Sequence, residues 1–390
     1  MQLLYELSQA AIEQVDTTFV RYMDAILPWE NRLTALIGPR GVGKTTLILQ
    51  HIKNSPQRNR MLYVSAETVY FSENKLFNTA MDFHKNGGIY LFIDEIHKYK
   101  GWALELKMIY DNFPKLKVFF TGSSVLDIYS GTADLSRRAL VYYMHGMSFR
   151  EYLNKELNIS VPTFTLEQVL QGNVSITERV EYPLVHFKEY LQRGFYPFST
   201  EKGYFLRLNQ IVAMTIENDI PTYANVSLGV ANKLKHLLQI ITDSVPFKPN
   251  HSKIAEMIGI DRKQIVGYFN LMERAGLIMQ LRDNTKGIRA LGKVNKMYLD
   301  NTNLLYALSN STPNVGNMRE TFFMNQLRVS HSPFASSVSD FEIDGKTFEI
   351  GGKSKGQSQI KDVAEGYVVR DDIEQGFANT LPLWHFGLLY

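Results

Sequence analysis

Apolar runs of strand length alternate with helical patterns in the first part of the chain. Four runs have the β-branched and aromatic character of buried strands, at residues 33–37, 61–65, 89–95 and 117–124. Between them, apolar residues recur at helical spacing from residue 47, from about 74 to 85 and from 102 to 112. Strands that alternate with helices indicate an α/β fold with a parallel sheet.

The N-terminal segment, residues 1 to about 27, reads as helix. Apolar residues recur there at helical spacing, and the pattern continues until Pro28, which we expect to end it. The members of this apolar face near the start are Leu3, Leu4, Leu7, Ala11 and Ile12. We expect a packing helix that leads into the first strand.

The second half of the chain has a different pattern. Residues 149 to about 235 are largely helical, and further helices are predicted at 234–241, 252–259 and 262–274, the last capped by Asp261. Strands at 277–281 and 296–300 follow. Three helices and a hairpin predict a winged helix-turn-helix. The C-terminal part pairs an amphipathic helix at 317–327 with a hairpin that turns at Asp344 and Gly345.

Composition narrows the class of protein. The chain has 390 residues, of which 45% are hydrophobic and 21% charged, as in a globular protein of two to four domains. A net charge of +3 does not indicate nucleic-acid binding by the whole chain, so any basic surface must be local. The absence of cysteine excludes disulfides and cysteine-based metal sites. Without a signal peptide or a run long enough to span a membrane, we expect a cytoplasmic protein with no membrane partner.

An octapeptide after the first strand has the spacing G-x-x-x-x-G-K-[ST]. It reads Gly38, Pro39, Arg40, Gly41, Val42, Gly43, Lys44 and Thr45, and Thr46 follows. Glycines let backbone N–H groups turn toward phosphate oxygens, and the next helix adds the positive end of its dipole. We expect these residues to bind ATP, with Lys44 on the β- and γ-phosphates and Thr45 on Mg²⁺. The alternative is a Gly-rich turn before a core helix.

The apolar strand at 89–95 ends in two acids, the form of a Walker B motif. We expect Asp94 to hold Mg²⁺ with Thr45, and Glu95 to orient and deprotonate the attacking water. A kinase does not need the second acid, whereas a hydrolase does. The alternative is an ordinary strand end with solvated acids. His97 is expected to be a positioning or surface residue, because no second histidine lies at ligand spacing.

Two further groups are candidates for the γ-phosphate. Thr121, or next Ser123, stands at the polar end of the neighbouring strand and is expected to read the γ-phosphate or hold the water; the alternative is a hydroxyl that satisfies the backbone. Arg137 or Arg138 would stabilise transition-state charge, in cis or from another subunit. A solvated basic pair is the alternative.

These motifs, GPRGVGKT, FIDEIH, FFTGSS, SRRAL and MSFREYL, resemble in order and spacing those of bacterial and archaeal AAA+-type ATPases. More narrowly, they resemble the family whose ATPase core precedes an uncharacterised C-terminal region. The resemblance covers residues from about 10 to 230 well. It implies that Thr121 is a sensor, that Arg137 or Arg138 is an arginine finger, and that residues 149–230 form a helical lid over the nucleotide. A finger supplied in trans would require a homo-oligomer.

A local basic surplus marks the predicted winged helix. Residues 246–293 contain nine Lys or Arg and four Asp or Glu, a surplus of five. Arg262 and Lys263 at the start of the third helix, with Lys286 and Arg289 in the wing, can contact the phosphates and bases of DNA. The alternative is a module that only packs on the ATPase or on a second subunit.

The C-terminal hairpin resembles the core of PD-(D/E)XK nucleases. Asp340 and Glu349 stand on its two strands, Lys353 follows, and Glu320 lies on the preceding helix. In that family two acids bind Mg²⁺ and the lysine activates water or stabilises the phosphorane. The chain departs from the pattern, because Gly351 stands where the lysine is expected and no Pro-Asp precedes the hairpin. The acids can also be charges that protect an edge strand.

The sequence therefore predicts a P-loop NTPase core at 1–148, a helical lid at 149–230, a winged helix-turn-helix at 231–300 and a small α+β nuclease-like domain at 301–390. We expect an Mg²⁺-dependent ATPase of the AAA+ type whose activity is coupled to DNA. One alternative is a nucleotide-switched DNA-binding protein with little turnover and an inactive nuclease-like tail. The other is an ATP-driven nuclease.

Overall fold

A computed structural model describes residues 1–122, 135, 137–176, 178–224, 228–244, 246–284, 293–309, 312–356 and 358–390. These residues form two compact units, 1–146 and 147–390. The second unit contains all of the predicted lid, winged-helix and nuclease-like segments. It also contains residues 147 and 148, the last two of the predicted ATPase core.

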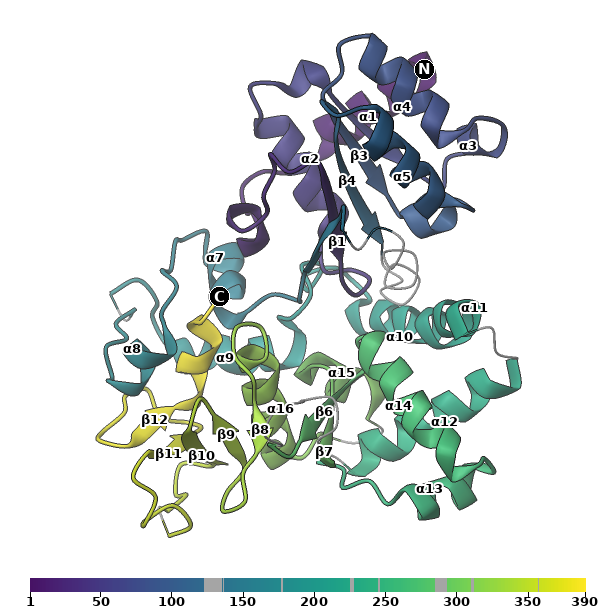
Figure 1. Cartoon of the computed structure of the whole chain (residues 1–390). Coiled ribbons are helices and arrows are strands. Elements are labelled where there is room, and N and C mark those ends of the chain that lie inside the picture. Colours follow the sequence, from purple (N-terminus) through teal and green to yellow (C-terminus); the bar gives the residue numbers. More distant parts are fainter. Residues whose placement is uncertain are drawn as a thin grey trace. The chain divides into compact units, whose positions relative to one another are not determined.

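The first unit is built on a five-stranded parallel sheet (Figure 1). The strand order is β2-β3-β4-β1-β5, so the two strands that carry the phosphate-loop and Walker B motifs flank β4. The strands are β1 (Leu33–Ile37), β2 (Met61–Ser65), β3 (Tyr90–Asp94), β4 (Lys117–Gly122) and β5 (Leu140–Tyr143). The predicted α/β class with a parallel sheet is therefore confirmed.

Both faces of the sheet are largely buried along β1 to β4, whereas the edge strand β5 is partly exposed. Successive side chains of β3 point to opposite faces, so Leu91 and Ile93 join one apolar cluster while Tyr90 and Phe92 join the other. The helices are α1 (Gln2–Gln14), α2 (Lys44–Asn54), α3 (Tyr70–Glu73), α4 (Leu76–Lys85) and α5 (Trp102–Asn112), with 3₁₀ turns η1 (Tyr22–Ala25), η2 (Arg58–Arg60) and η3 (Ile96–Lys98). Burial on both faces explains why these strands read as continuous apolar runs.

The predicted helix over residues 1–27 is wrong beyond Gln14. Val15 is extended, and the Asp16 carboxylate accepts hydrogen bonds from the backbone N–H and hydroxyl of Thr18, at 2.9 and 2.7 Å. Gln50 of α2 donates to the carbonyls of Asp16 and Phe19, at 2.6 and 2.8 Å. A local side-chain turn and these tertiary bonds satisfy the backbone better than a continued helix.

The second unit begins with helices and ends with a mixed sheet. Its first helices are α7 (Phe149–Leu157), α8 (Leu166–Leu170), α9 (Pro183–Arg193), α10 (Tyr204–Met214) and α11 (Ile220–Ala224), with a π-helical turn η4 (Thr215–Asp219) before α11. Next come α12 (Leu228–Ser244), α13 (His251–Ile258) and α14 (Arg262–Arg274), followed by antiparallel strands β6 (Ile278–Arg282) and β7 (Val294–Leu299). Asp261 caps α14 as expected, accepting from the N–H of Lys263 at 2.7 Å.

The C-terminal part contains α15 (Thr302–Leu308), α16 (Val315–Leu327) and a five-stranded sheet of order β12-β11-β10-β9-β8. Its strands are β8 (Phe334–Ala335), β9 (Phe341–Ile343), β10 (Lys346–Gly351), β11 (Gly366–Arg370) and β12 (Thr380–Pro382), and the 3₁₀ helix η6 (Leu383–Leu388) follows. β9 and β10 form the predicted antiparallel hairpin, while β10, β11 and β12 run parallel.

Distant segments share the interior of the second unit. The fully buried Asn303 donates to the carbonyls of Tyr190 and Leu191, at 3.1 and 3.0 Å, and accepts from the N–H of Phe195 at 2.9 Å. Ser148 donates to the carbonyl of Tyr390 at 2.6 Å. Residues from the predicted lid and from the C-terminal segment are therefore parts of one packed body.

Candidate functional site

The phosphate-loop backbone requires glycine at defined positions. Gly38 has φ +152°, and a Cβ atom there would lie 2.3 Å from the carbonyl oxygen of Met144. Gly41 and Gly43 also have positive φ, at +80° and +97°. The fully buried Val42 anchors the loop between them. The sequence pattern therefore reflects conformations and close approaches that other residues would resist.

Helix α2 begins directly after this loop. Its cap residue, Gly43, has no side chain to cover the first N–H groups. The Lys44 side chain is buried, and its amine donates to the carbonyls of Gly38 and Pro39, both at 2.8 Å. Uncapped N–H groups, the helix dipole and a lysine held over the loop form an anion-binding arrangement.

A buried arginine, which sequence reasoning missed, holds the same loop. Arg21 donates to the carbonyl of Val42 in the loop and, at 2.9 Å, to the carbonyl of His145 after β5. Arg21 is only 4% exposed. Because Arg21 lies in an irregular segment far from the motif, no spacing rule connects it to the loop.

Asp94 at the end of β3 joins three other elements. One of its oxygens, Oδ2, accepts from the hydroxyl of Thr45 at 2.8 Å and from that of Tyr63 on β2 at 2.9 Å. The other, Oδ1, accepts from the hydroxyl of Thr121 on β4. Burial, together with the Asp94 charge, raises the pKa of Tyr63 well above its usual range, so the phenol remains a donor. Tyr63 was not expected from the sequence.

Glu95 is held beside Asp94 in an unusual backbone conformation. Its φ is +50°, a left-handed value that is uncommon for a residue with a side chain. The backbone N–H of Glu95 donates to the Thr121 hydroxyl at 3.1 Å, and its carboxylate lies 3.3 Å from Nδ1 of His97. The His97 side chain is 5% exposed, which agrees with a positioning rather than a surface residue.

The predicted arginines differ in environment. Arg138 forms a two-bond ion pair with Asp111 of α5, at 3.0 and 3.1 Å, whereas Arg137 is exposed. Ser123, the alternative to Thr121, lies outside the described residues. Pro39 and Arg40 lie within the loop, and Thr46 lies in the first turn of α2.

The oxygen atoms of Thr45 and Asp94 suit a magnesium ion. Mg²⁺ prefers hard oxygen ligands and is usually bound by one or two protein groups together with phosphates and water. The 2.8 Å separation of Thr45 Oγ1 and Asp94 Oδ2 places two such ligands side by side at the uncapped start of α2.

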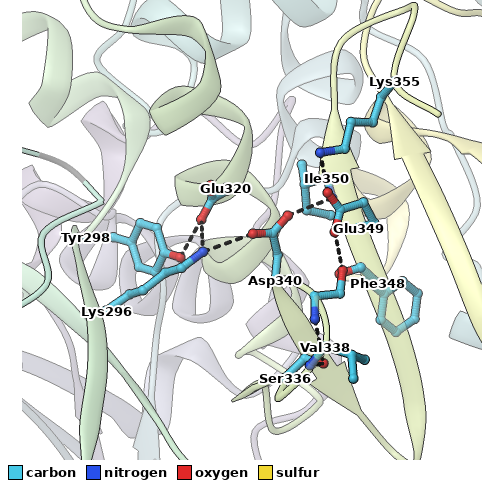
Figure 2. Close-up of polar contacts among 11 residues, drawn as sticks. Lys296, Tyr298, Glu320, Ser336, Val338, Asp340, Phe348, Glu349, Ile350 and Lys355 are labelled. Carbon is cyan, nitrogen blue, oxygen red and sulfur yellow. Dashed lines mark hydrogen bonds and ion pairs between the residues drawn. The ribbon is translucent and has the colours of Figure 1, made fainter. Parts of the chain in front are cut away.

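A second polar cluster lies in the C-terminal part of the chain (Figure 2). Lys296 of β7 donates to Glu320 of α16 at 3.0 Å and to Asp340 at 2.9 Å. Tyr298 donates to the same Glu320 oxygen at 2.7 Å. The other oxygen of Asp340 accepts from the backbone N–H of Ile350 on β10 at 3.0 Å. We call these groups, with Glu349 and Lys355, the acid–lysine cluster.

Glu349 pairs with Lys355 and not with Lys353, the lysine that the sequence predicted. Its side chain is 3% exposed and pairs with Lys355, while Lys353 is exposed. The backbone turns back on itself, with the N–H of Lys355 donating to the Gly352 carbonyl at 2.9 Å. The Lys355 stem then occupies space that a side chain at Gly351 would need, since a Cβ there would lie 2.4 Å from Lys355 Cγ.

Burial and charge shift proton affinities in this cluster. Burial and the nearby Asp340 raise the pKa of Glu320, although Lys296 opposes the change. Burial alone would lower the pKa of Lys296, but the two carboxylates raise it. Among the described residues, no group of three or more His, Cys, Asp or Glu is placed to hold one metal ion. Two lysines pair with the three carboxylates of the cluster as it stands.

The predicted DNA-contact residues are only partly described. Arg262 and Lys263 are exposed at the start of α14, whereas Lys286 and Arg289 lie outside the described residues. No helix in the described parts of the chain is long and apolar enough to cross a lipid bilayer.

Two family profiles match separate parts of the chain. Residues 30–153 match the AAA domain family, and residues 184–315 match a domain of unknown function, DUF8612. Together with the five-stranded parallel sheet, the first match gives the N-terminal unit an AAA-type P-loop ATPase fold. The parallel sheet and this match agree with the predicted P-loop NTPase core.

Individual proteins that resemble this chain do so at low sequence identity. An uncharacterized protein of Methanocaldococcus jannaschii is 27% identical over 272 residues, which cover 65% of this chain and 57% of that protein. The Walker-type ATPase of Pyrococcus abyssi is 14% identical, with a TM-score of 0.44 over 76% of this chain and 99% of its own. AMPPCP-bound DnaA from Aquifex aeolicus is 15% identical, with a TM-score of 0.25 over 70% of this chain and 87% of its own. At these scores the two structures add nothing to the fold assignment.

Proposed function

We propose that this protein is an Mg²⁺-dependent ATPase of the AAA+ type. The observation that carries the proposal is the hydrogen bond from Thr45 to Asp94, which joins the phosphate loop to the end of the Walker B strand. Three glycines with positive φ and a buried lysine on the loop carbonyls support the same function.

Each polar residue then has a role. Lys44 and the N–H groups of α2 bind the phosphates, and Thr45 with Asp94 holds Mg²⁺, which when bound neutralises phosphate charge. Glu95 takes a proton from the water whose oxygen attacks the γ-phosphorus in line, as ADP leaves. Thr121 holds the two acids through its bonds to Asp94 and to the Glu95 backbone.

Arg137 is our candidate for an arginine finger. Arg138 is engaged by Asp111, whereas Arg137 is exposed and so accessible to the nucleotide of another subunit. A finger in trans would make activity depend on self-association. The lid role of residues 149–230 remains part of this proposal, since nucleotide state would act on the second unit through it.

We further propose that ATP turnover is coupled to duplex DNA. Helices α13 and α14, with the β6–β7 pair, have the order of a winged helix, and Arg262 and Lys263 are exposed at the start of α14. If the module only packs against protein, DNA will have no effect on turnover.

Phosphate release from ATP, measured with and without duplex DNA, tests this coupling. We expect DNA to raise the turnover of the wild type, and Arg262→Ala with Lys263→Ala to remove that increase but not the basal rate. Lys202→Ala with Lys235→Ala, which also removes two exposed lysines, is the control. Turnover that is indifferent to DNA would contradict the coupling. A strong DNA shift with negligible turnover would favour the nucleotide-switched alternative.

A second candidate function is hydrolysis of a phosphodiester by the acid–lysine cluster. It is favoured by the convergence of Glu320, Asp340 and Glu349 with Lys355. The aliphatic part of the Lys355 side chain occupies the space that a side chain at Gly351 would take. Divalent metal would have to displace Lys296 from Glu320 and Asp340. Mg²⁺- or Mn²⁺-dependent cutting of DNA is the readout, and no cutting with either ion would leave an inactive nuclease-like fold.

A further inference from the structure

A cleft of about 540 Å³ lies in the second unit, between α14, β6 and the segment that follows α16. This volume is in the range of pockets that hold small organic ligands. The lining contains no residue of the phosphate loop, the Walker B strand or the acid–lysine cluster. The cleft is therefore separate from both sites described above.

Positive charge dominates the lining of this cleft. Arg274, Arg282 and Arg328 contribute guanidinium groups, His331 adds an imidazole, and Glu273 is the one carboxylate among the lining residues. With histidine neutral, three positive charges and one negative charge line the cleft, and the Asp300 carboxylate, which pairs with Arg328 from outside the lining, reduces the formal surplus to one. A concave basic surface of this kind attracts anions.

Two of the guanidinium groups are fixed in place. Arg282 forms a two-bond pair with Glu273, at 3.0 and 3.3 Å, and the same carboxylate accepts from the backbone and side chain of Gln280 at 2.9 and 2.8 Å. Arg328 donates to the buried Asp300 at 2.7 Å. These pairs hold the two guanidinium groups in fixed positions at the cleft.

Arg274 is different from the other two arginines. It stands in the last turn of α14 and is exposed, and its side chain has no hydrogen-bond or ion-pair partner among the described residues. Removing it therefore leaves no buried carboxylate without its counter-ion. It is the residue whose loss reports ligand binding with the least effect on folding.

The remaining lining is apolar or amide. Pro333 and Phe334 offer a half-buried apolar surface on which a planar ring can stack, and the buried Met279 and Met324 complete the apolar lining. The half-buried Asn270 adds an amide, whereas the amide of Gln280 is engaged by Asn270 and Glu273. Arginines for a phosphate beside an apolar surface for a base form the chemistry of a nucleotide site. We propose that this cleft binds one nucleotide unit, either as a free nucleoside monophosphate or within a single strand.

Equilibrium binding to the full chain carrying Lys44→Ala tests the proposal. The probes are AMP, which lacks the β- and γ-phosphates that the phosphate loop binds, and a fluorescein-labelled oligothymidylate. We expect at least one to bind, and Arg274→Ala to weaken that binding by about ten-fold, as for loss of a charged hydrogen bond. Lys202→Ala, which removes an exposed lysine of the same unit, should leave the affinity unchanged.

The two probes identify the source of the nucleotide. Binding of AMP that Arg274→Ala weakens indicates a free nucleotide, and binding of the oligothymidylate alone indicates a strand. The proposal is overturned if neither probe binds, or if Arg274→Ala and Lys202→Ala behave alike. ATP turnover of Arg274→Ala should stay at the wild-type level, so failure here would leave the ATPase proposal intact.

Discussion

At the scale of single residues, hydroxyl groups from three elements hold Asp94, namely those of Thr45, Tyr63 and Thr121. Sequence spacing was sufficient to identify Lys44, Thr45, Asp94 and Glu95 as candidates, because a short loop and a strand end fix their neighbours. Thr121 could be named for the same reason, since it ends an adjacent strand. No comparable spacing rule identifies Lys296, because it lies on β7 and donates to Glu320 and Asp340 from outside the β9–β10 hairpin.

Lys355 gives the residue-scale prediction. If the acid–lysine cluster cuts DNA, Lys355→Ala should lower the rate by roughly a hundred-fold, because it removes the cation that touches Glu349. Lys353→Ala, on the exposed neighbour two residues away, should have little effect. Gel analysis of DNA cleavage in Mn²⁺ measures both. Equal loss in the two variants would show that the loop contributes only charge.

At the scale of elements, the sequence predicted helices and strands well where local signals were strong. Residues 102–112 and 262–274 are helices with the predicted bounds. The N-terminal helix failed because its end depends on an Asp16 turn and on bonds from Gln50 of α2. Such tertiary bonds have no signature in the local apolar pattern.

The phosphate loop gives the element-scale prediction. Gly38→Ala places a methyl group 2.3 Å from the Met144 carbonyl in a strained backbone, so we expect loss of ATP binding and a lower unfolding temperature. Gly87→Ala is the matched control, because its φ is +89° but nothing lies within 4 Å of the added atom. It should cost only about 1–2 kcal/mol of backbone strain and keep ATP binding. Equal behaviour of the two variants would contradict the close approach as the cause.

At the scale of the whole molecule, the sequence could not show how the C-terminal segments pack. Segments predicted as a lid and as a C-terminal domain share a buried hydrogen bond through Asn303, and Ser148, the last residue of the predicted core, bonds to the carbonyl of Tyr390. These pairings join residues more than a hundred positions apart, and polar residues give no periodic signal. Composition and periodicity therefore identified the elements of the second unit but not its single packed interior.

His385 makes the stability of that unit depend on pH. Burial lowers its pKa from 6.5 to about 3. Above pH 6.5 the imidazole is neutral in both the folded and unfolded states. As the pH falls below 6.5, the unfolded state takes up a proton that the folded state refuses until about pH 3, so the free energy of unfolding decreases.

We expect this effect to reach about 2 kcal/mol at pH 5. His385→Leu should flatten the loss of stability between pH 6.5 and 3, measured by denaturant unfolding at each pH. His331→Leu, at a partly exposed histidine, is the control and should keep the acid dependence. An unchanged slope in His385→Leu would assign the acid sensitivity to other groups.

ATP turnover in Glu95→Gln tests the central claim most directly. Phosphate release and nucleotide binding would be measured for the wild type, Glu95→Gln and the exposed control Glu73→Gln. We predict that the wild type turns over ATP, and that Glu95→Gln still binds ATP but hydrolyses it at least about a hundred-fold more slowly. Glu73→Gln should match the wild type. Undiminished hydrolysis by Glu95→Gln, or no hydrolysis by the wild type with or without DNA, would contradict the assignment of Glu95 and of the protein as a hydrolase.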